Sequence, residues 1–304
     1  MEGSITLSAR LNAALWRVIF GPIGRLLPFG ACRRLAGPLA WGAWHLGARR
    51  EVALRNLRLA FPGLDNEERE KLARRSLASL LTVYLELPTL RHLSDAGLRR
   101  AITIENLELL TTIGPEGALL LSGHFGNWEL LAYGAAALAG IPFSIIVKEQ
   151  RDYGQLERMR TSRGNRLIPT SRGAREATAL LRSGGVIAML ADQSAGEGDE
   201  LVEMFGIPTY TYAAPARLAL RFRPRVIVGF AVREEKGAGG YNVQLRELRH
   251  GDLEDTPEGV HLFTQRYVEM LEETIREHPE QWVWQHRKWK NTPGISYDRP
   301  EKEG

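Results

Sequence analysis

Residues 118–147 read ALLLSGHFGNWELLAYGAAALAGIPFSIIV, and this stretch determines the expected fold class. Ala118–Ser122 is a short apolar run suited to a buried strand. Residues 128–139 have the composition of a helix, and residues 143–147 form a second apolar run. Because strand, helix and strand in succession make a βαβ unit, the sequence predicts an α/β fold with a mainly parallel central sheet flanked by helices.

The alternation of helices and strands continues beyond this unit, which favours one large α/β domain in a chain of 304 residues. We expect residues 1–100 to form an N-terminal helical region and residues 101–304 to form the catalytic α/β domain, the two packed as one unit. Further helices are predicted at 51–62, 66–87 (ended by Pro88), 153–163, 174–181, 213–221 and 258–277 (with Thr256 as N-cap), and further strands at 167–168, 186–191, 226–232 and 241–248.

The N-terminal region carries most of the positive charge. The whole chain has a net charge of +4, whereas residues 1–58 contain nine arginines and two glutamates, a balance of +7. Apolar residues recur at helical spacing from Leu7 to Ile19, with Arg10 and Arg17 beside that stripe. Such an amphipathic helix fits an anionic membrane surface, and a helix packed on the domain is the alternative. Since the positive excess is confined to an apolar segment, we expect lipid and no nucleic acid as the partner.

No stretch near the N-terminus predicts a membrane-spanning helix. The longest uncharged one, residues 35–48, has 14 residues and contains Pro38, whereas spanning takes about 20 apolar residues. The single cysteine, Cys32, cannot form an internal disulfide, and no Cys/His spacing typical of zinc sites occurs. These features predict peripheral or N-terminally anchored attachment in a reducing compartment, with neither a metal nor a cofactor.

The turn between the first strand and its helix carries the candidate chemistry. His124 and Glu129 are five positions apart, so on one continuous helix they would point about 140° away from each other. They can meet if His124 lies on the turn after the strand and Glu129 on the first helical turn. The Glu129 carboxylate would then hold one imidazole nitrogen and leave the other to take a proton from a hydroxyl. No G-x-S-x-G nucleophile motif is present. We therefore expect the substrate group to pass directly to an external hydroxyl, without a covalent intermediate on the enzyme.

Several blocks, in the same order, resemble the bacterial lipid A biosynthesis acyltransferase family, the late lauroyl and myristoyl acyltransferases. This family is related to glycerophosphate acyltransferases, so the resemblance implies a glycerophosphate-acyltransferase-like α/β fold. The resembling blocks are NLRLAFPGL at 56–64, HFGNWEL at 124–130, an Arg-x-x-x-Gly element at 160–164, ADQSAGEGDELVEMFGIPTYTYAAPARLA at 191–219 and QWVWQHRKWK at 281–290.

The resemblance implies transfer of a fatty acyl group from acyl carrier protein, or from acyl-CoA, to a hydroxyl of a lipid A-type saccharide lipid. The reaction would take place at the cytoplasmic face of the inner membrane. By the match, His124 and Glu129 are the catalytic pair.

The same resemblance implies a set of substrate-binding residues. Arg160 is the candidate for stabilising the thioester oxyanion or for binding a phosphate, and Arg163 competes for that role. Asp192 and Gln193 would line the site after the strand at 186–191, and Asn127 is a further candidate contact.

Three rival hypotheses remain open from the sequence. The acceptor could be a phosphatidylinositol mannoside or a lysophospholipid, with acyl-CoA as donor. The chain could be a metal hydrolase that uses His124, Glu129 and Asp192 as ligands, although an H-E-x-x-H helix is absent. It could also be a non-enzymatic module that binds lipid or RNA through its basic N-terminal region.

Overall fold

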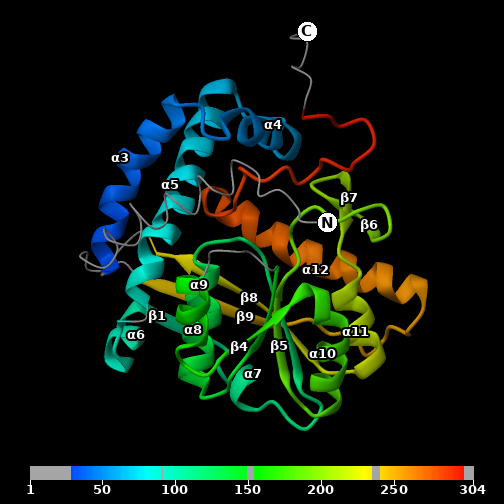
Figure 1. The fold of residues 1–304 in the computed structure, drawn as a ribbon. Helices are drawn as coiled ribbons and strands as arrows, with labels where there is room; N and C mark the ends of the chain where they lie inside the picture. Colours follow the sequence, from blue (N-terminus) through cyan, green and yellow to red (C-terminus); the bar gives the residue numbers. More distant parts are fainter. Residues whose placement is uncertain (1–28, 91, 149–153, 235–239, 298–304) are drawn as a thin grey trace, which may run out of the picture.

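The computed structural model of the 304-residue chain describes residues 29–90, 92–148, 154–234 and 240–297. At its centre lies a sheet with helices on both faces (Figure 1). The amphipathic helix expected at residues 7–19 lies outside the described residues and stays a prediction.

Seven strands form the central sheet: β1 (Ile102–Glu105), β2 (Ala118–Ser122), β3 (Ser144–Val147), β4 (Arg166–Pro169), β5 (Val186–Leu190), β8 (Arg225–Arg233) and β9 (Tyr241–Glu247). Their spatial order is β1-β9-β8-β2-β5-β3-β4. β2 lies parallel to β5 and β8, and β3 lies parallel to β4 and β5. β9 is antiparallel to β8 and parallel to the edge strand β1. The prediction of a mainly parallel α/β sheet is therefore confirmed.

The central strand β2 is buried on both faces, which explains its uninterrupted apolar sequence. Successive side chains of a strand point to opposite faces. Accordingly, Leu119 and Leu121 belong to one core cluster, whereas Ala118 and Leu120 belong to the other.

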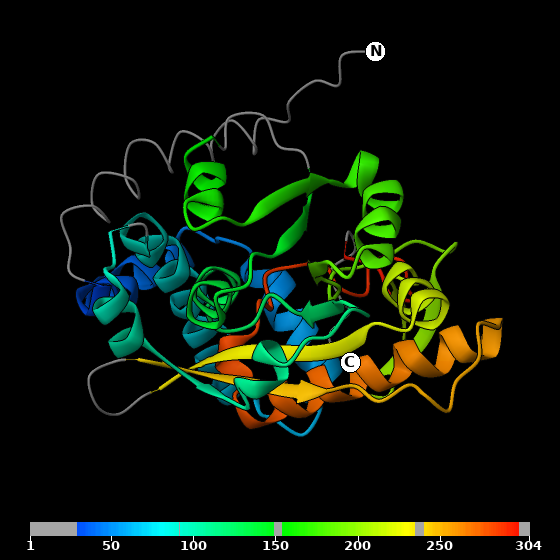
Figure 2. The same cartoon turned by 90° about the horizontal axis from the view of Figure 1, so that it is seen from below.

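The helices form two layers that cover the two faces of the sheet. Figure 2 shows α12, in orange, running along the yellow strands β8 and β9. Apolar residues of α5 (Asn66–Leu90) contribute to both core clusters. The first cluster contains side chains of α4 (Arg50–Ala60), α10 (Thr170–Arg182), α11 (Ala214–Phe222) and α12 (Pro257–Glu277), and the second those of α6 (Asp95–Ala101), α8 (Trp128–Ala139) and α9 (Gly154–Thr161).

The N-terminal helices share their core with the sheet. Trp44 of α3 (Cys32–His45) and Leu57 of α4 belong to the same buried cluster as Val228 of β8. The boundary expected near residue 100 between the two regions stays a prediction. No helix in the described part of the chain is both long and apolar enough to cross a lipid bilayer.

Several element boundaries differ from the predicted ones. α5 continues to Leu90, so the prediction that Pro88 ends this helix is wrong. The Thr89 hydroxyl donates to the Glu86 carbonyl at 2.7 Å, which supports this last turn. Sequence reasoning also missed the short helix α7 (Glu108–Thr111) and the antiparallel hairpin of β6 (Glu200–Met204) and β7 (Ile207–Thr211). The predicted cap of α12 is confirmed, since Thr256 accepts a hydrogen bond from the amide of Gly259 at 3.1 Å.

Gly126 allows a close approach between the turn after β2 and the neighbouring strand β8. It has a φ of +53° and forms an isolated bridge to Ala231. A Cβ atom at this position would lie 1.8 Å from the carbonyl oxygen of Ala231. Because that oxygen belongs to the backbone of a central strand, it cannot move aside without disturbing the sheet.

We therefore expect Gly126→Ala to lower the free energy of unfolding by about 2–5 kcal/mol, the sum of left-handed strain and overpacking. Gly140→Ala is the matched control, because Gly140 also has a positive φ but would have no atom within 4 Å of its Cβ. Its cost should be limited to strain of about 1–2 kcal/mol. Urea unfolding followed by circular dichroism measures both, and equal costs would contradict the steric argument.

Candidate active site

His124 lies on the turn that follows β2, and Glu129 lies on the first turn of α8, as the spacing of the two residues predicts. The backbone of this turn is paired with residues far along the chain. Phe125 bridges to Trp282 in antiparallel fashion, and the amide of Val283 donates to the His124 carbonyl at 3.2 Å. The C-terminal segment thus fixes the turn that presents the imidazole.

Asp192 holds His124 through both its backbone and its side chain. One carboxylate oxygen accepts from the His124 amide at 2.7 Å, and the other lies 2.7 Å from Nδ1. The indole of Trp282 donates to the same carboxylate at 3.0 Å. Asp192 follows β5, and β5 is the parallel neighbour of β2, so the carboxyl ends of the two strands bring these residues together.

The expectation that the Glu129 carboxylate holds the imidazole is therefore wrong, because Asp192 occupies that position. Glu129 instead binds Arg160 of α9 in a bidentate pair: the guanidinium Nε lies 2.8 Å from one carboxylate oxygen, and a terminal nitrogen contacts the other. An Arg–carboxylate pair of this geometry is rigid. Glu129 thus fixes the position of a cation beside His124.

The carboxylates near His124 oppose the effect that burial has on its pKa. Burial lowers the pKa of the imidazole, but the Asp192 carboxylate, its hydrogen bond and the nearby charge of Glu129 raise it, and the net result is a raised pKa. Burial acts to raise the pKa of Asp192, but His124 and the hydrogen bonds outweigh it, so this carboxyl stays well below its usual range. The pair therefore combines an ionised carboxylate with an imidazole that is ready to take a proton.

The second imidazole nitrogen of His124 faces a donor. The amide nitrogen of Gln193 lies 3.2 Å from Nε2. With Nδ1–H donating to Asp192, Nε2 carries the free lone pair, which is the tautomer that a general base requires. An incoming hydroxyl that donates its proton to Nε2 would occupy the position where the Gln193 amide now lies. The ring of Trp128, 5.1 Å away between centroids, flanks the imidazole.

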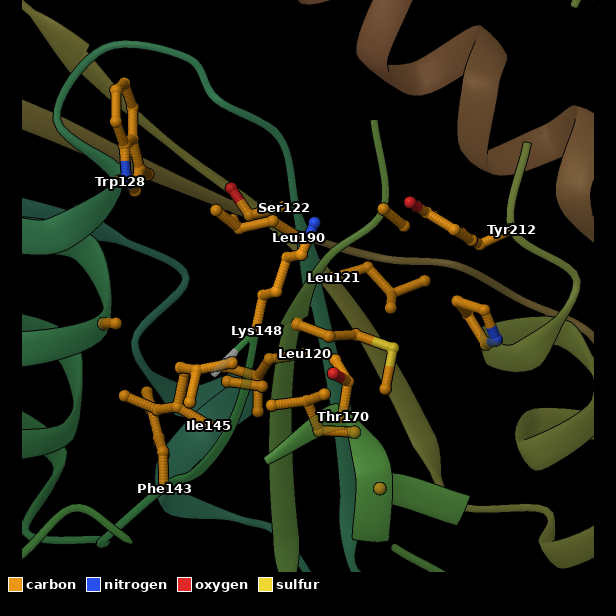
Figure 3. Close-up of a pocket in the computed structure, with 18 of the residues that line it drawn as sticks. Leu120, Leu121, Ser122, Trp128, Phe143, Ile145, Lys148, Thr170, Leu190 and Tyr212 are labelled. Atoms are coloured by element: carbon orange, nitrogen blue, oxygen red, sulfur yellow. The ribbon is translucent and has the colours of Figure 1, made fainter. Parts of the chain in front are cut away.

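A cavity of about 910 Å³ opens beside His124. Figure 3 shows that its wall is mostly apolar, with Leu120 and Leu121 of β2, Ile145 of β3 and Leu190 of β5 among the labelled side chains. This volume lies at the upper end of ordinary ligand sites. Polar side chains also reach the wall, among them those of Glu129, Lys148, Glu157, Arg160, Gln193, Tyr212 and Arg217.

The structure brings four of the predicted site residues to this cavity: His124, Glu129, Arg160 and Gln193. Asp192 is buried against His124. Asn127 differs from the expected substrate contact, because it is fully buried and its amide groups bind within the protein.

The two candidate arginines, Arg160 and Arg163, differ in their contacts. Arg163 donates to the Tyr133 hydroxyl at 2.8 Å and to the Leu93 carbonyl at 2.7 Å, and it pairs with Asp95. It therefore links the turn after α9 to Tyr133 of α8 and to the start of α6. Arg160, and not Arg163, lines the cavity.

Sequence reasoning missed several residues that line the cavity, namely Trp128, Lys148, Tyr212 and Arg217. Trp128 had a usable signal, because it directly precedes Glu129 in the resembling block. Tyr212 and Arg217 also lie in a resembling block, at 191–219, but their place at the cavity depends on how α11 packs against α10, α12 and β2.

The metal-hydrolase hypothesis needs His124, Glu129 and Asp192 to converge on one ion. Within the described ranges, no group of three or more His, Cys, Asp or Glu side chains is placed to hold a metal ion. Glu129 is engaged by Arg160, and Asp192 is engaged by His124 and Trp282.

The fold and the site define an α/β protein with a carboxylate-paired histidine beside a mostly apolar cavity. The chain belongs to the bacterial lipid A biosynthesis acyltransferase family, which matches residues 4–291. It is accordingly an acyltransferase.

Three relatives illustrate the range of this similarity. The lipid A biosynthesis acyltransferase of Haemophilus influenzae is 26% identical over 293 residues, which cover 93% of this chain and 90% of the relative. The lipid A biosynthesis lauroyltransferase of Escherichia coli is 24% identical over 94% of this chain and 95% of the relative. The phosphatidylinositol mannoside acyltransferase of Mycobacterium tuberculosis is 25% identical over 67% of this chain and 64% of the relative.

We expect Asp192→Asn to change the pH dependence of acyl transfer. A protonated imidazole cannot act as a base, so kcat/KM of the wild type should fall as the pH drops through the raised pKa of His124. Without the Asp192 charge, burial lowers that pKa, so the acidic limb should move to lower pH. The plateau should also fall by about 10²–10⁴.

The control is Asp252→Asn, which removes an exposed carboxylate paired with Arg266. Its pH profile of kcat/KM should match that of the wild type. An acidic limb that stays in place in Asp192→Asn, or moves to higher pH, would count against Asp192 as the group that tunes His124.

Proposed function

We propose that the protein transfers a fatty acyl chain from a thioester, of acyl carrier protein or of CoA, to a hydroxyl of a lipid A-type saccharide lipid, with His124 as general base. One observation carries this proposal: His124 lines a mostly apolar cavity of about 910 Å³ while Asp192 binds its Nδ1, which leaves Nε2 beside Gln193, another lining residue.

In the proposed reaction, the acceptor hydroxyl donates its proton to Nε2 of His124 while its oxygen attacks the thioester carbonyl carbon. Asp192 stabilises the resulting imidazolium. When the tetrahedral intermediate collapses, the carbon–sulfur bond breaks and the thiolate takes the proton from His124. Arg160, fixed by Glu129, supplies positive charge for the oxyanion or for a phosphate of the substrate.

The cavity supports a long acyl chain as the transferred group. Burying one methylene contributes about 0.8 kcal/mol, so a chain of about twelve methylenes contributes roughly 10 kcal/mol before entropic costs. Side chains of β2, β3 and β5 supply the apolar wall for such a chain. Among the described residues, three cations, Lys148, Arg160 and Arg217, line the wall together with two acids, Glu129 and Glu157, and this excess of one positive charge suits an anionic donor or acceptor.

An alternative acceptor follows from the mycobacterial relative, which is named for phosphatidylinositol mannoside. In this second hypothesis, the chain uses acyl-CoA to acylate a phosphatidylinositol mannoside or a lysophospholipid. The chemistry at His124 is unchanged, so only the choice of donor and acceptor separates the two.

A direct assay tests the function. The purified protein is incubated with acyl carrier protein and CoA thioesters and with lipid A precursors, phosphatidylinositol mannosides and lysophospholipids, and the products are identified by mass spectrometry. We expect His124→Ala and Glu129→Ala to abolish transfer, because the first removes the base and the second releases Arg160. Their circular dichroism spectra should match that of the wild type.

His261→Ala is the control for this assay, because His261 is half exposed on α12 near Glu200. Turnover by folded His124→Ala would refute the mechanism. Acylation of the mannosides or lysophospholipids alone would replace the lipid A-type acceptor with the alternative.

We further propose that the protein works at the cytoplasmic face of the inner membrane, attached peripherally or through its N-terminal region. Leu35, Leu39 and Leu46 are 38%, 39% and 89% exposed. At 100° per residue they fall on one side of α3 and its C-cap. Exposed leucines in line beside an arginine-rich segment are typical of helices that lie in a membrane interface.

We expect the double substitution Leu39→Asn and Leu46→Asn to weaken binding to phosphatidylglycerol-containing vesicles about tenfold, because less apolar area enters the interface. Sedimentation with vesicles measures the binding. Leu201→Asn is the control, since this leucine on β6 is 42% exposed. Equal binding by all three proteins would contradict a role for α3.

A further inference from the structure

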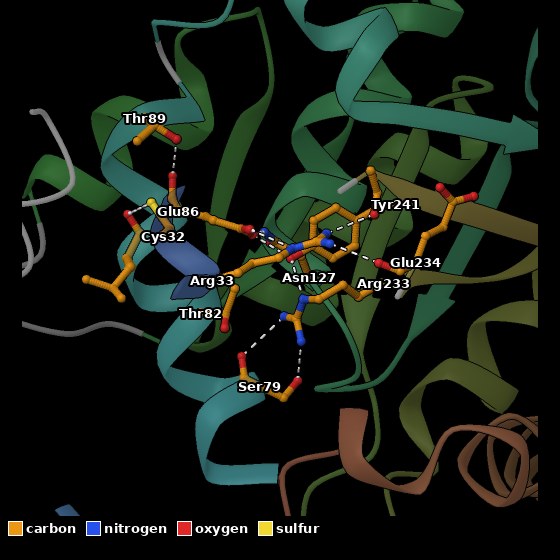
Figure 4. Close-up of polar contacts among 12 residues, drawn as sticks. Cys32, Arg33, Ser79, Thr82, Glu86, Thr89, Asn127, Arg233, Glu234 and Tyr241 are labelled. Atoms are coloured by element: carbon orange, nitrogen blue, oxygen red, sulfur yellow. Dashed lines mark hydrogen bonds and ion pairs between the residues drawn. The ribbon is translucent and has the colours of Figure 1, made fainter. Parts of the chain in front are cut away.

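A cluster of charged and polar side chains around the buried Glu86 lies next to the active-site turn. We call it the Glu86 cluster, and it consists of Glu86 of α5, Asn127, Arg33 of α3, Arg233 of β8 and Tyr241 of β9 (Figure 4). Both Glu86 and Asn127 are 0% exposed. The proposed reaction makes no use of Glu86, so it does not explain why an acid is buried at this position.

Glu86 is held from two sides. One of its carboxylate oxygens accepts from the Asn127 side-chain amide at 2.8 Å and from the Tyr241 hydroxyl. The other lies 3.7 Å from Nε of Arg33. Burial raises the pKa of Glu86; the charges of Arg233 and Arg33 and the hydrogen bonds act in the opposite direction, but the net result is a raised pKa.

Asn127 connects this cluster to the active site. Its side-chain oxygen accepts from the amide of Leu130 at 2.9 Å and so caps α8. Because the oxygen is used for the cap, the amide nitrogen must point the other way, towards Glu86. Asn127 stands between His124 and Glu129 in the chain, so the rotation of its side chain is coupled to the turn that carries both.

Burying an acid together with charged partners is costly, and a buried pair is seldom more stable than an apolar replacement. An isolated N-cap needs no such partner, since serine, threonine or aspartate would serve as well. What Glu86 adds is a fixed orientation of the Asn127 amide, anchored to α5 and β9. This is a gain in precision of the turn rather than in stability.

We propose that Glu86 is a positioning residue for acyl transfer, acting through Asn127 to hold the turn that places His124 and Glu129. The proposal rests on the proposed function, in which these two residues face the thioester and the acceptor. Neither Glu86 nor Asn127 lines the cavity, so their effect should fall on kcat and leave KM for the thioester unchanged.

The test uses an exchange of donor and acceptor. Asn127→Asp keeps a cap for α8 but sets a carboxylate against that of Glu86. Adding Glu86→Gln restores a donor–acceptor pair with its direction reversed. Asn127→Ser keeps a cap and removes only the donor to Glu86, which preserves the test if Asn127→Asp does not fold. Glu67→Gln is the control, because Glu67 is an exposed acid on α5.

We expect Asn127→Asp to lower kcat about 100-fold and Asn127→Ser about tenfold, as small misplacements of catalytic groups do. KM for the thioester should stay within about twofold. The double variant Glu86→Gln/Asn127→Asp should recover at least about tenfold of the loss in kcat. All rates are measured at a temperature at which circular dichroism shows each variant folded.

Wild-type kcat in Asn127→Asp or Asn127→Ser, a change confined to KM, or a double variant no faster than Asn127→Asp would overturn the positioning role. If His124→Ala abolishes transfer in the same assay, such a result leaves the proposed function standing. Transfer by folded His124→Ala would remove the general base instead.

Discussion

The site depends on one carboxylate that binds a single residue twice. Asp192 accepts from the amide and faces Nδ1 of His124, so it fixes the turn after β2 and the rotation of the imidazole together. The parallel pairing of β2 and β5 makes this possible, because it brings the ends of two strands side by side. A carboxylate on α8 could orient the ring but could not also tie down the backbone beneath it.

Each acid around the site has a different partner. Asp192 binds His124 and Glu129 binds Arg160. Glu86 lies on the far side of Asn127, beside Arg33 and Arg233. Each acid has a cationic or hydrogen-bonding partner, which lowers the cost of its burial. The short turn from His124 to Glu129 therefore lies between fixed charges on both sides.

Local sequence patterns predicted much of the fold, because an apolar strand, a capped helix and a βαβ unit can each be recognised from consecutive residues. The spatial order of the strands in the sheet cannot be recognised in this way. The partner of His124 lies 68 residues away, whereas the sequence favours Glu129, which is five positions from His124 and stands in the same resembling block. A signal for Glu86 did exist: it is an acid between the buried Leu85 and Leu87 on α5. Its partners on β8 and β9 had no such signal.

The segment at residues 281–283 completes the turn from the opposite end of the chain. Gly126 donates to the Gln281 carbonyl at 2.9 Å, Phe125 bridges to Trp282, and Val283 donates to the His124 carbonyl. During synthesis, the ribosome releases the strand, the imidazole and Asp192 long before this segment emerges. A nascent chain therefore lacks these backbone contacts until residues 281–283 have been made, and the turn that carries the imidazole is completed only then.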